Sequence, residues 1–325
     1  MKAHRNVMRL LEEARQEQRL AFSRRPAEQA ALHRRAAAGE LSHVYSGKPS
    51  LYAAASYWSE LTPPQRTMHI ARSLAKEHNG WVFGGLVAAV AYGFEHQWRL
   101  HDGTVSIAVT DHGTHHSGRQ LKRVYVPKAK TVAVAHTETG LTLLPPAYTL
   151  IDCASSFEFR HALPFFDSAF AKGVTADDVF AACSRMHIDQ AALSRLLRHV
   201  NTNSENGGES LARGTMIEER FRPPRVQVPV RDPQTGDEYR TDFVWTLQDG
   251  KVIVGEYDGT RKYVDPEMTD NRTIREVVSK ERERDEALKR AGAHEIVHFN
   301  YDDVIKRAPL VVKLLKAGVP RREDE

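Results

Sequence analysis

The chain has 325 residues, of which 41% are hydrophobic and 27% are charged, and it contains only two cysteines. This composition argues against a disordered chain, a collagen, a disulfide scaffold or a membrane bundle. At roughly 100 to 200 residues per domain, the length predicts two or three domains. Because the two cysteines form no paired motif and the N-terminus lacks an apolar signal core, we expect a cytoplasmic protein with no membrane association.

The positive charge is unevenly distributed along the chain. The formal net charge is +4, from 46 Lys and Arg against 42 Asp and Glu. Residues 1–47 contain nine basic and five acidic residues, so the remaining 278 residues contain 37 of each. The whole excess therefore lies at the N-terminus, which indicates a contact with nucleic acid there.

The N-terminal pattern is typical of a DNA-binding fold. Apolar residues at helical spacing predict a helix within residues 2–20, and Pro26 opens a second helix that ends near Gly39. Residues 41–45 alternate like a short strand. This order predicts a winged helix-turn-helix over residues 1–47. A solvated pair of helices is the alternative. The candidate nucleic-acid-binding residues are Arg24, Arg25, Arg34 and Arg35.

From Thr62 the pattern becomes mixed and predicts a middle domain over residues 48–200. We expect helices over residues 62–77, after Gly85, from Pro145 and over 164–172, 175–184 and 187–200, with strands near 104–109, 121–127 and 131–136. The polar, glycine-containing stretch 201–208 predicts a domain boundary.

The last region, residues 207–325, predicts a compact sheet with helices on its faces. Strands are expected at 226–230, 239–246, 251–257 and 295–299, and helices at 209–221, 269–291 and 301–317. The fold class expected for the whole chain is α/β, an α+β multidomain protein.

Three acidic residues in this region stand out by position. Asp242 lies in one strand of the predicted hairpin, Glu256 ends the other, and Glu209 begins the helix before them. Carboxylates that converge repel one another unless a cation binds, and their hard oxygens suit Mg²⁺ or Mn²⁺. Such a metal would orient a phosphate and activate a water molecule. Asp242 and Glu256 are therefore the expected metal ligands, with Glu209 completing the shell or positioning the water.

Other charged residues are candidates near the same site. Asp258 follows Glu256 by two residues and would share its face of the strand, where it is a further candidate catalytic acid. Lys262 and Lys280 are candidates for stabilising charge on a phosphate. Arg284 lies four residues after Lys280 on the same helix face, which could contact phosphate or be only solvated.

Four segments of this region carry a family resemblance. They are residues 209–213 (ESLAR), 239–245 (YRTDFVW), 254–263 (VGEYDGTRKY) and 280–288 (KERERDEAL). Together they resemble the very-short-patch-repair-like, DUF559-type branch of the PD-(D/E)XK nuclease superfamily. The resemblance implies a sheet flanked by helices and Mg²⁺-dependent hydrolysis of phosphodiester bonds.

One position departs from the superfamily pattern. The superfamily's Glu-x-Lys would place a lysine at position 258, where this chain has Asp258. A Glu-x-Asp-Gly arrangement is usual for this branch. The charge-stabilising role must then move to Lys262 or Lys280, or be missing.

The front part is similar to proteins with an AbiEi-like antitoxin domain. Residues 38–47, the helix after Trp81, and residues 141–154 and 166–169 carry this likeness. It implies a DNA-binding winged helix, followed by a domain that contributes to regulation or to neutralising a toxin, and hence a toxin or other protein partner.

Asp152 and Asp167 could be acids of a second site. Each lies in an apolar helical context without a partner acid nearby, which favours a structural role. The leading hypothesis is a DNA-directed, metal-dependent endonuclease. The alternatives are a non-catalytic DNA-binding regulator or antitoxin-like protein with a degenerate nuclease fold, and a partner-binding scaffold.

Overall fold

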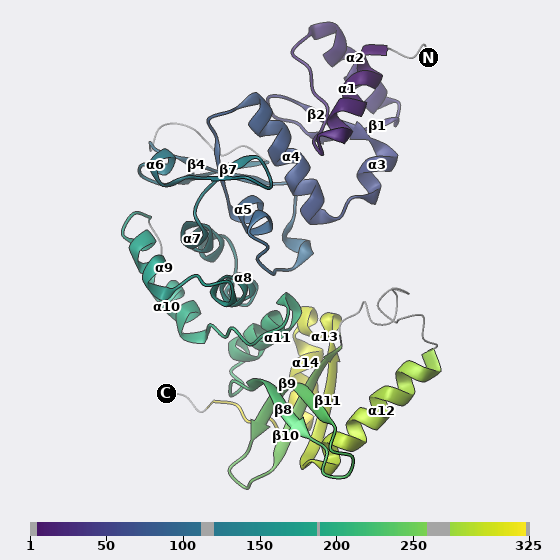
Figure 1. Ribbon diagram of the computed structural model, residues 1–325, viewed down its shortest axis with the longest axis vertical. Helices are drawn as coiled ribbons and strands as arrows, with labels where there is room; N and C mark the ends of the chain where they lie inside the picture. Colours follow the sequence, from purple (N-terminus) through teal and green to yellow (C-terminus); the bar gives the residue numbers. More distant parts are fainter. Residues whose placement is uncertain (1–4, 112–119, 187–188, 259–273, 323–325) are drawn as a thin grey trace. The chain divides into compact units, whose positions relative to one another are not determined.

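The structure is a computed structural model that describes residues 5–111, 120–186, 189–258 and 274–322, with backbone alone for residues 274–278. It has the mixed α/β fold that the sequence predicts (Figure 1). The chain divides into two compact units, each made of two segments. Unit 1 comprises residues 1–157 and 173–194, and unit 2 comprises residues 158–172 and 195–325. Within the described ranges, no helix is both long and apolar enough to cross a membrane.

Unit 1 begins with two helices and a hairpin. The elements are α1 (Arg5–Gln16), α2 (Pro26–Ala37), β1 (Leu41–Tyr45), β2 (Leu51–Ala54) and α3 (Ala55–Glu60). β1 pairs antiparallel with β2, and Val7, Leu32 and Leu41 pack in a small buried cluster. The partner of the predicted strand 41–45 therefore lies beyond residue 47, so the hairpin extends past the predicted limit of this domain.

The rest of unit 1 surrounds a five-stranded sheet in the order β5-β4-β3-β7-β6. Its strands are β3 (Val82–Gly84), β4 (Val105–Val109), β5 (Leu121–Tyr125), β6 (Val134–His136) and β7 (Leu141–Leu143). Its helices are α4 (Pro63–Glu77), α5 (Gly85–Ala91), η1 (Trp98–Leu100), α6 (Ala129–Val132), α7 (Pro146–Ser156) and α9 (Ala176–Cys183). The strand predicted near residues 131–136 is shorter than expected, because α6 takes up its first residues.

Unit 2 is built on a four-stranded sheet in the order β11-β10-β9-β8. Its strands are β8 (Arg225–Arg231), β9 (Glu238–Thr246), β10 (Val252–Asp258) and β11 (Ala293–Asn300). The first three strands are antiparallel, and β11 runs parallel to β10. Its helices are α8 (Phe159–Ala171), the end of α10 (Gln190–His199), α11 (Gly207–Glu218), α12 (Ile274–Arg290), α13 (Tyr301–Lys306) and α14 (Ala308–Lys316).

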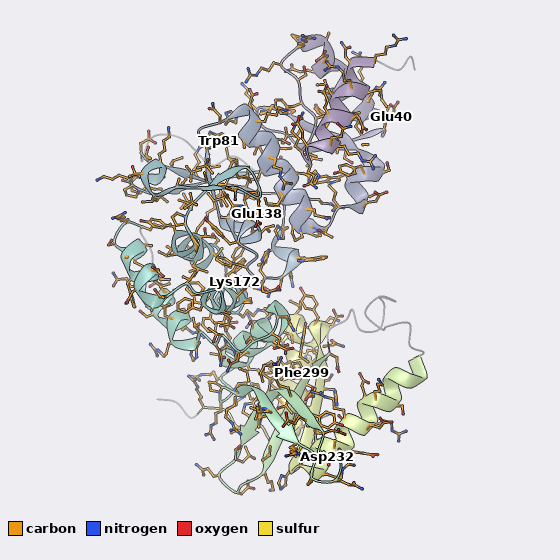
Figure 2. The ribbon with its side chains drawn as sticks, viewed as in Figure 1. Glu40, Trp81, Glu138, Lys172, Asp232 and Phe299 are labelled. Atoms are coloured by element: carbon orange, nitrogen blue, oxygen red, sulfur yellow. The ribbon has the colours of Figure 1, made fainter. Side chains whose placement is uncertain are left out.

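Both faces of this sheet are covered. Strand alternation puts Phe243 on one face, packed in a cluster with Phe299 and residues of α11, α13 and α14. Phe299 is labelled in Figure 2. Val244 and Val254 lie on the opposite face, where Leu288 of α12 packs against them. The sheet is therefore the middle of three layers, and α12 covers the face that bears the even-numbered residues of β9 and β10.

Two predicted boundaries differ from the structure. α8 packs on α11 in unit 2, although the stretch 201–208 was expected to separate them. Gly214 of α11 allows this close packing, because a Cβ there would lie 2.9 Å from Cα of Arg160. The helix predicted over 301–317 is broken at Arg307, whose φ of 62° is left-handed and which precedes the Ala308-Pro309 pair.

Candidate metal centre

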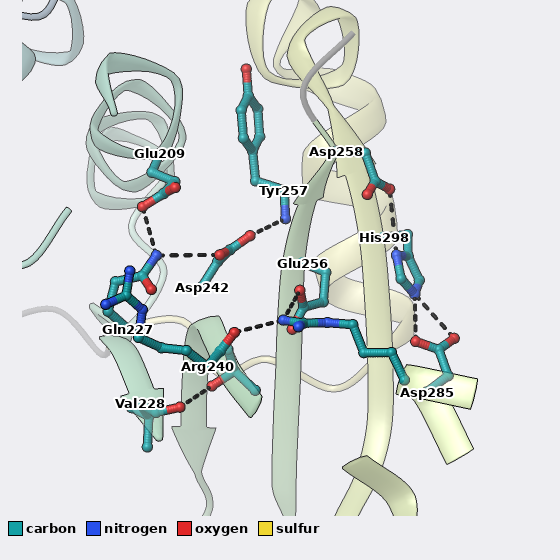
Figure 3. A network of polar contacts seen from close by, with 12 residues as sticks. Glu209, Gln227, Val228, Arg240, Asp242, Glu256, Tyr257, Asp258, Asp285 and His298 are labelled. Carbon is teal, nitrogen blue, oxygen red and sulfur yellow. Dashed lines mark hydrogen bonds and ion pairs between the residues drawn. The ribbon is translucent and has the colours of Figure 1, made fainter. Parts of the chain in front are cut away.

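Asp242 and Glu256 lie side by side on two antiparallel strands. Phe243 of β9 pairs with Gly255 of β10, which brings the acids that adjoin this pair together on the α12 face. Figure 3 shows both carboxylates between the strands, with Asp258 farther along β10. The structure therefore brings Asp242 and Glu256 together, whereas Asp258 lies apart from them beside His298.

Asp242 is held by two hydrogen bonds. Its Oδ2 accepts from the backbone N–H of Tyr257 at 2.8 Å, and its Oδ1 accepts from Nε2 of Gln227 at 3.2 Å. The same Gln227 nitrogen donates to Oε2 of Glu209 at 2.8 Å. Gln227 has a φ of 52° within β8, a conformation that costs a non-glycine residue roughly 1 kcal/mol. The amide of Gln227 thus joins the predicted acids Glu209 and Asp242.

Glu209 is positioned by the first turn of α11. Its buried carboxylate accepts from the N–H of Glu205 at 2.9 Å and from Nδ2 of Asn206 at 2.6 Å. Asn206 also caps the helix. Gly208, the residue before Glu209, must be small, because a Cβ there would lie 2.6 Å from the ring of Tyr257. Glu209 is therefore fixed at the edge of the site and reaches Asp242 through Gln227.

Glu256 is the buried acid of the site, with 7% of its surface exposed. Its Oε2 accepts from a terminal nitrogen of Arg284 at 2.9 Å, whereas Oε1 is buried and has no hydrogen-bond partner among the described residues. Burial raises the pKa of Glu256 to about 7; Arg284 opposes this shift and the charge of Asp242 adds to it. An unpartnered buried carboxylate oxygen is costly unless a proton or cation reaches it.

Asp258 contacts a histidine that the sequence analysis did not select. His298 of β11 is the parallel-strand partner of Glu256. Its Nδ1 lies 3.4 Å from Asp258, and its Nε2 lies 3.1 Å from both oxygens of Asp285 on α12. Since each ring nitrogen faces a carboxylate, the ring is held as an imidazolium. The hydrogen bond to Asp258 raises the pKa of His298 to about 9, with Asp285 contributing and burial opposing.

The centre contains carboxylate oxygens, the type of ligand that Mg²⁺ takes. No group of three or more acid, histidine or cysteine side chains is arranged to hold a metal ion within the described ranges. Mg²⁺ commonly takes one or two carboxylates and completes its octahedron with water and phosphate. Asp242 and Glu256 would be those two carboxylates, and Oε1 of Glu256 has no hydrogen-bond partner among the described residues. Glu209, which was expected in the shell, is bound to Gln227 instead.

Lys280 forms no ion pair with the acids of this centre within the part of the chain that the structure describes. Lys280 is exposed on α12, one turn before Arg284. Lys262 lies outside the described residues. Arg284, predicted as a nucleic-acid contact, is the basic residue that the structure places on Glu256.

The four candidate nucleic-acid-binding arginines of the N-terminal region have different surroundings. Arg34 is exposed on α2, while Arg24 and Arg25 are exposed and form ion pairs with Glu77 at 3.0 Å and Glu28 at 3.4 Å. Arg35 was predicted to contact nucleic acid, but it is buried. It lies against Met8 and 3.8 Å from Glu40, because it faces α1 and the end of its own helix. Arg35 is therefore a packing residue.

Arg24 lines a groove of about 670 Å³. α2, the turn between β1 and β2, and the end of α4 line it. Its polar lining residues include Arg24, Gln29, His33, Lys48 and His78.

Asp152 and Asp167 have the structural roles expected of them. Asp152 is buried, with Oδ1 2.8 Å from Nζ of Lys122. Asp167 is buried against Arg213 at 2.6 Å. Neither belongs to the acidic centre described above.

Gln227 and His298 are the residues of the centre that sequence reasoning missed. Each lies on a strand that is paired with the strand of a predicted acid. Gln227 follows Val226, whose partner Phe243 follows Asp242, and His298 is the partner of Glu256. A sequence shows such neighbours only once the strand register is known.

Comparisons with known proteins found little. No family model matches the chain, and no curated protein matches it. One solved structure is similar at 18% sequence identity, the RV2827C protein from Mycobacterium tuberculosis. That match covers 71% of this chain and 88% of the other, with a TM-score of 0.38.

Proposed function

We propose that the chain is a DNA-acting, Mg²⁺-dependent endonuclease that hydrolyses phosphodiester bonds at Asp242 and Glu256. The observation that carries this proposal is the pair of carboxylates on adjacent strands, one of which has a buried oxygen without a described partner. When bound, the metal would polarise the phosphate and lower the pKa of a water molecule.

The surrounding residues hold the two acids in place. Gln227 and the N–H of Tyr257 fix the carboxylate of Asp242, while Arg284 fixes one oxygen of Glu256. Because each acid is restrained by hydrogen bonds, little reorganisation is needed when a cation binds. Asp258 is bound to His298, so its role is to keep the imidazole of His298 protonated.

The test is cleavage of plasmid, single-stranded DNA and RNA with Mg²⁺ or Mn²⁺. Asp242→Asn and Glu256→Gln keep the side-chain size and remove the charge, and each should lower cleavage at least 100-fold. Asp302→Asn, an exposed acid of the same unit, is the matched control. Cleavage that persists in both site variants would refute the assignment.

A second candidate is a non-catalytic DNA-binding regulator. Two observations favour it: Arg284 already neutralises Glu256, and Arg24, Arg34 and Lys48 are exposed on or beside α2. A helix and a hairpin turn that flank a groove are suited to a duplex backbone. A toxin or other protein partner remains part of this candidate.

Salt-dependent binding separates the two candidates. A regulator should bind a defined promoter sequence without cleaving it, and binding should weaken steeply with salt. Arg34→Ala combined with Lys48→Ala should weaken that binding, whereas Lys306→Ala should not. If the variant with Arg34→Ala and Lys48→Ala cleaves plasmid at the wild-type rate, the cleavage activity belongs to unit 2 alone.

A further inference from the structure

The basic residue at the acidic centre comes from α12. One terminal nitrogen of Arg284, Nη2, donates to Oε2 of Glu256 at 2.9 Å and to the carbonyl oxygen of Arg240 at 2.6 Å. The guanidinium carbon also lies 5.9 Å from the ring centre of Tyr239. These contacts come from β9 and β10, so the guanidinium is held across both strands that carry the acids.

Two further contacts fix α12 on the sheet. Asp285 follows Arg284 and binds His298 of β11. Near the end of the helix, Arg290 donates to both oxygens of Asp232 in the turn after β8, at 3.1 and 2.6 Å. Because Arg284, Asp285 and Arg290 all bind residues of the sheet or its turns, the position of the Arg284 guanidinium is set by the fold.

Arg284 has N–H groups that its contacts with Glu256 and Arg240 do not use. A guanidinium carries five N–H groups, and both polar contacts of Arg284 use Nη2. Within the described residues, Nε and Nη1 of Arg284 donate no hydrogen bond, and 32% of the side chain is exposed. The unused donors can therefore reach a group that arrives from solvent.

We propose that Arg284 is the phosphate-binding residue of the centre. It holds Glu256 through Oε2, which leaves Oε1 of Glu256 for a cation, and offers its remaining N–H groups to a non-bridging oxygen of a DNA phosphodiester. It thus places a positive charge directly beside the carboxylate of Glu256. Guanidinium is suited to this task because it binds phosphate through paired donors and stays charged at all working pH values. The inference rests on the proposed function of Asp242 and Glu256.

The experiment measures binding of a short DNA duplex by the full-length chain in chelator, where metal-dependent hydrolysis cannot proceed. Each phosphate contact contributes about 0.9 to the slope of log K against log salt concentration. Arg284→Gln keeps a polar side chain but removes the charge. It should reduce the slope by about 0.9 and weaken binding roughly threefold to tenfold at 0.15 M salt. Arg284→Lys should retain the slope.

Arg282→Met is the matched control, because Arg282 is exposed on α12 two residues from Arg284 and therefore on another side of the helix. It should leave the slope unchanged. Thermal unfolding of every variant reports whether the fold is intact; if Arg284→Gln does not fold, Arg284→Met takes its place. An unchanged slope in the charge-removing variant, or an equal loss in Arg284→Lys, would overturn the proposal, as would a wild-type chain that does not bind the duplex.

Cleavage assays in Mg²⁺, run in parallel, separate this inference from the proposed function. If Arg284→Gln reduces the salt slope of binding but the wild-type chain does not cleave DNA, the proposed nuclease activity is refuted and Arg284 is still a phosphate contact. Cleavage by the wild-type chain that Arg284→Gln retains in full would defeat the role of Arg284 while retaining the nuclease.

Discussion

Arg213 of α11 forms a buried ion pair with Asp167 of α8. Its terminal nitrogen Nη2 lies 2.6 and 2.8 Å from the two carboxylate oxygens. The backbone N–H of Asn201 donates to the same carboxylate at 2.8 Å, and Arg213 also donates to the carbonyl of His199 at 2.6 Å. The pair therefore connects three segments of unit 2.

Removing one partner of this pair should be costly. Arg213→Met leaves the Asp167 carboxylate buried without its cation, so we expect the free energy of unfolding of unit 2 to fall by about 3–5 kcal/mol. Hydrogen exchange of peptides from α8 and α11 measures the effect. The double variant Asp167→Leu with Arg213→Met should recover most of the loss, because no unpaired charge is left. A double variant less stable than Arg213→Met would contradict this explanation.

Gln227 offers a test of strain at the acidic centre. Gln227→Ala keeps the left-handed backbone and removes the amide that joins Glu209 to Asp242. Gln227→Gly removes the same amide but relieves the backbone, and should therefore be more stable than the alanine variant by about 1 kcal/mol. Urea unfolding of the two variants measures this difference. Equal stability would show that the φ of Gln227 stores no strain in solution.

Binding of the metal should stabilise unit 2. A ligand that binds only the folded chain raises stability by RT ln(1 + [L]/Kd), which is about 2.7 kcal/mol at 100 times Kd. Mn²⁺ should therefore raise the unfolding temperature, and a chelator should reverse the shift. Asp242→Asn and Glu256→Gln should abolish the shift, while Asp302→Asn should keep it. The same Mn²⁺ shift in all four proteins would place the binding elsewhere.

Acid should destabilise unit 1 through a pair of histidines. Nε2 of His96 and Nε2 of His101 lie 2.8 Å apart, and Nδ1 of His101 lies 2.8 Å from Oγ1 of Thr67. Burial, with the charge of His96 adding to it and Asp102 opposing it, lowers the pKa of His101 from 6.5 to about 3. The unfolded chain therefore takes up a proton below pH 6.5 that the folded chain does not.

The stability that His101 contributes is consequently present above pH 6.5 and is lost as the pH falls toward 3. Between pH 7.5 and 5 the loss should be about 1–2 kcal/mol. Hydrogen exchange of peptides from α4 and η1 at the two pH values measures it. His101→Gln should make the pH dependence smaller, and an unchanged dependence would assign the acid sensitivity to other groups.

Much of unit 2 could be predicted from the sequence because its signals are local. The alternation around Asp242 and Glu256 and the Asp249-Gly250 turn predict a hairpin, and the structure confirms strands and turn. The neighbours of the acids come from farther away. Gln227, Arg284 and His298 reach the centre through strand register and helix docking, which depend on packing between distant segments.

In the N-terminal region, the sequence did not indicate which arginines are buried. Its two helices and its first strand follow the predicted order, but the charge pattern alone did not separate exposed from buried arginines. Arg34 and Arg35 are adjacent in sequence, yet successive helix positions point about 100° apart, so one faces solvent and the other faces α1. α2, unlike α1, lacks a regular apolar stripe that would have indicated which of its sides is buried.

The order of segments along the chain has a consequence for how the protein can be made and rearranged. α8, a helix of unit 2, is synthesised before α9 of unit 1, so the ribosome releases the last part of unit 1 only after the first part of unit 2. A gene cut anywhere between residues 172 and 207 would separate α11 from Asp167, the partner of Arg213. A recombined gene that keeps this ion pair together with the acidic centre must therefore also carry the coding sequence for α8.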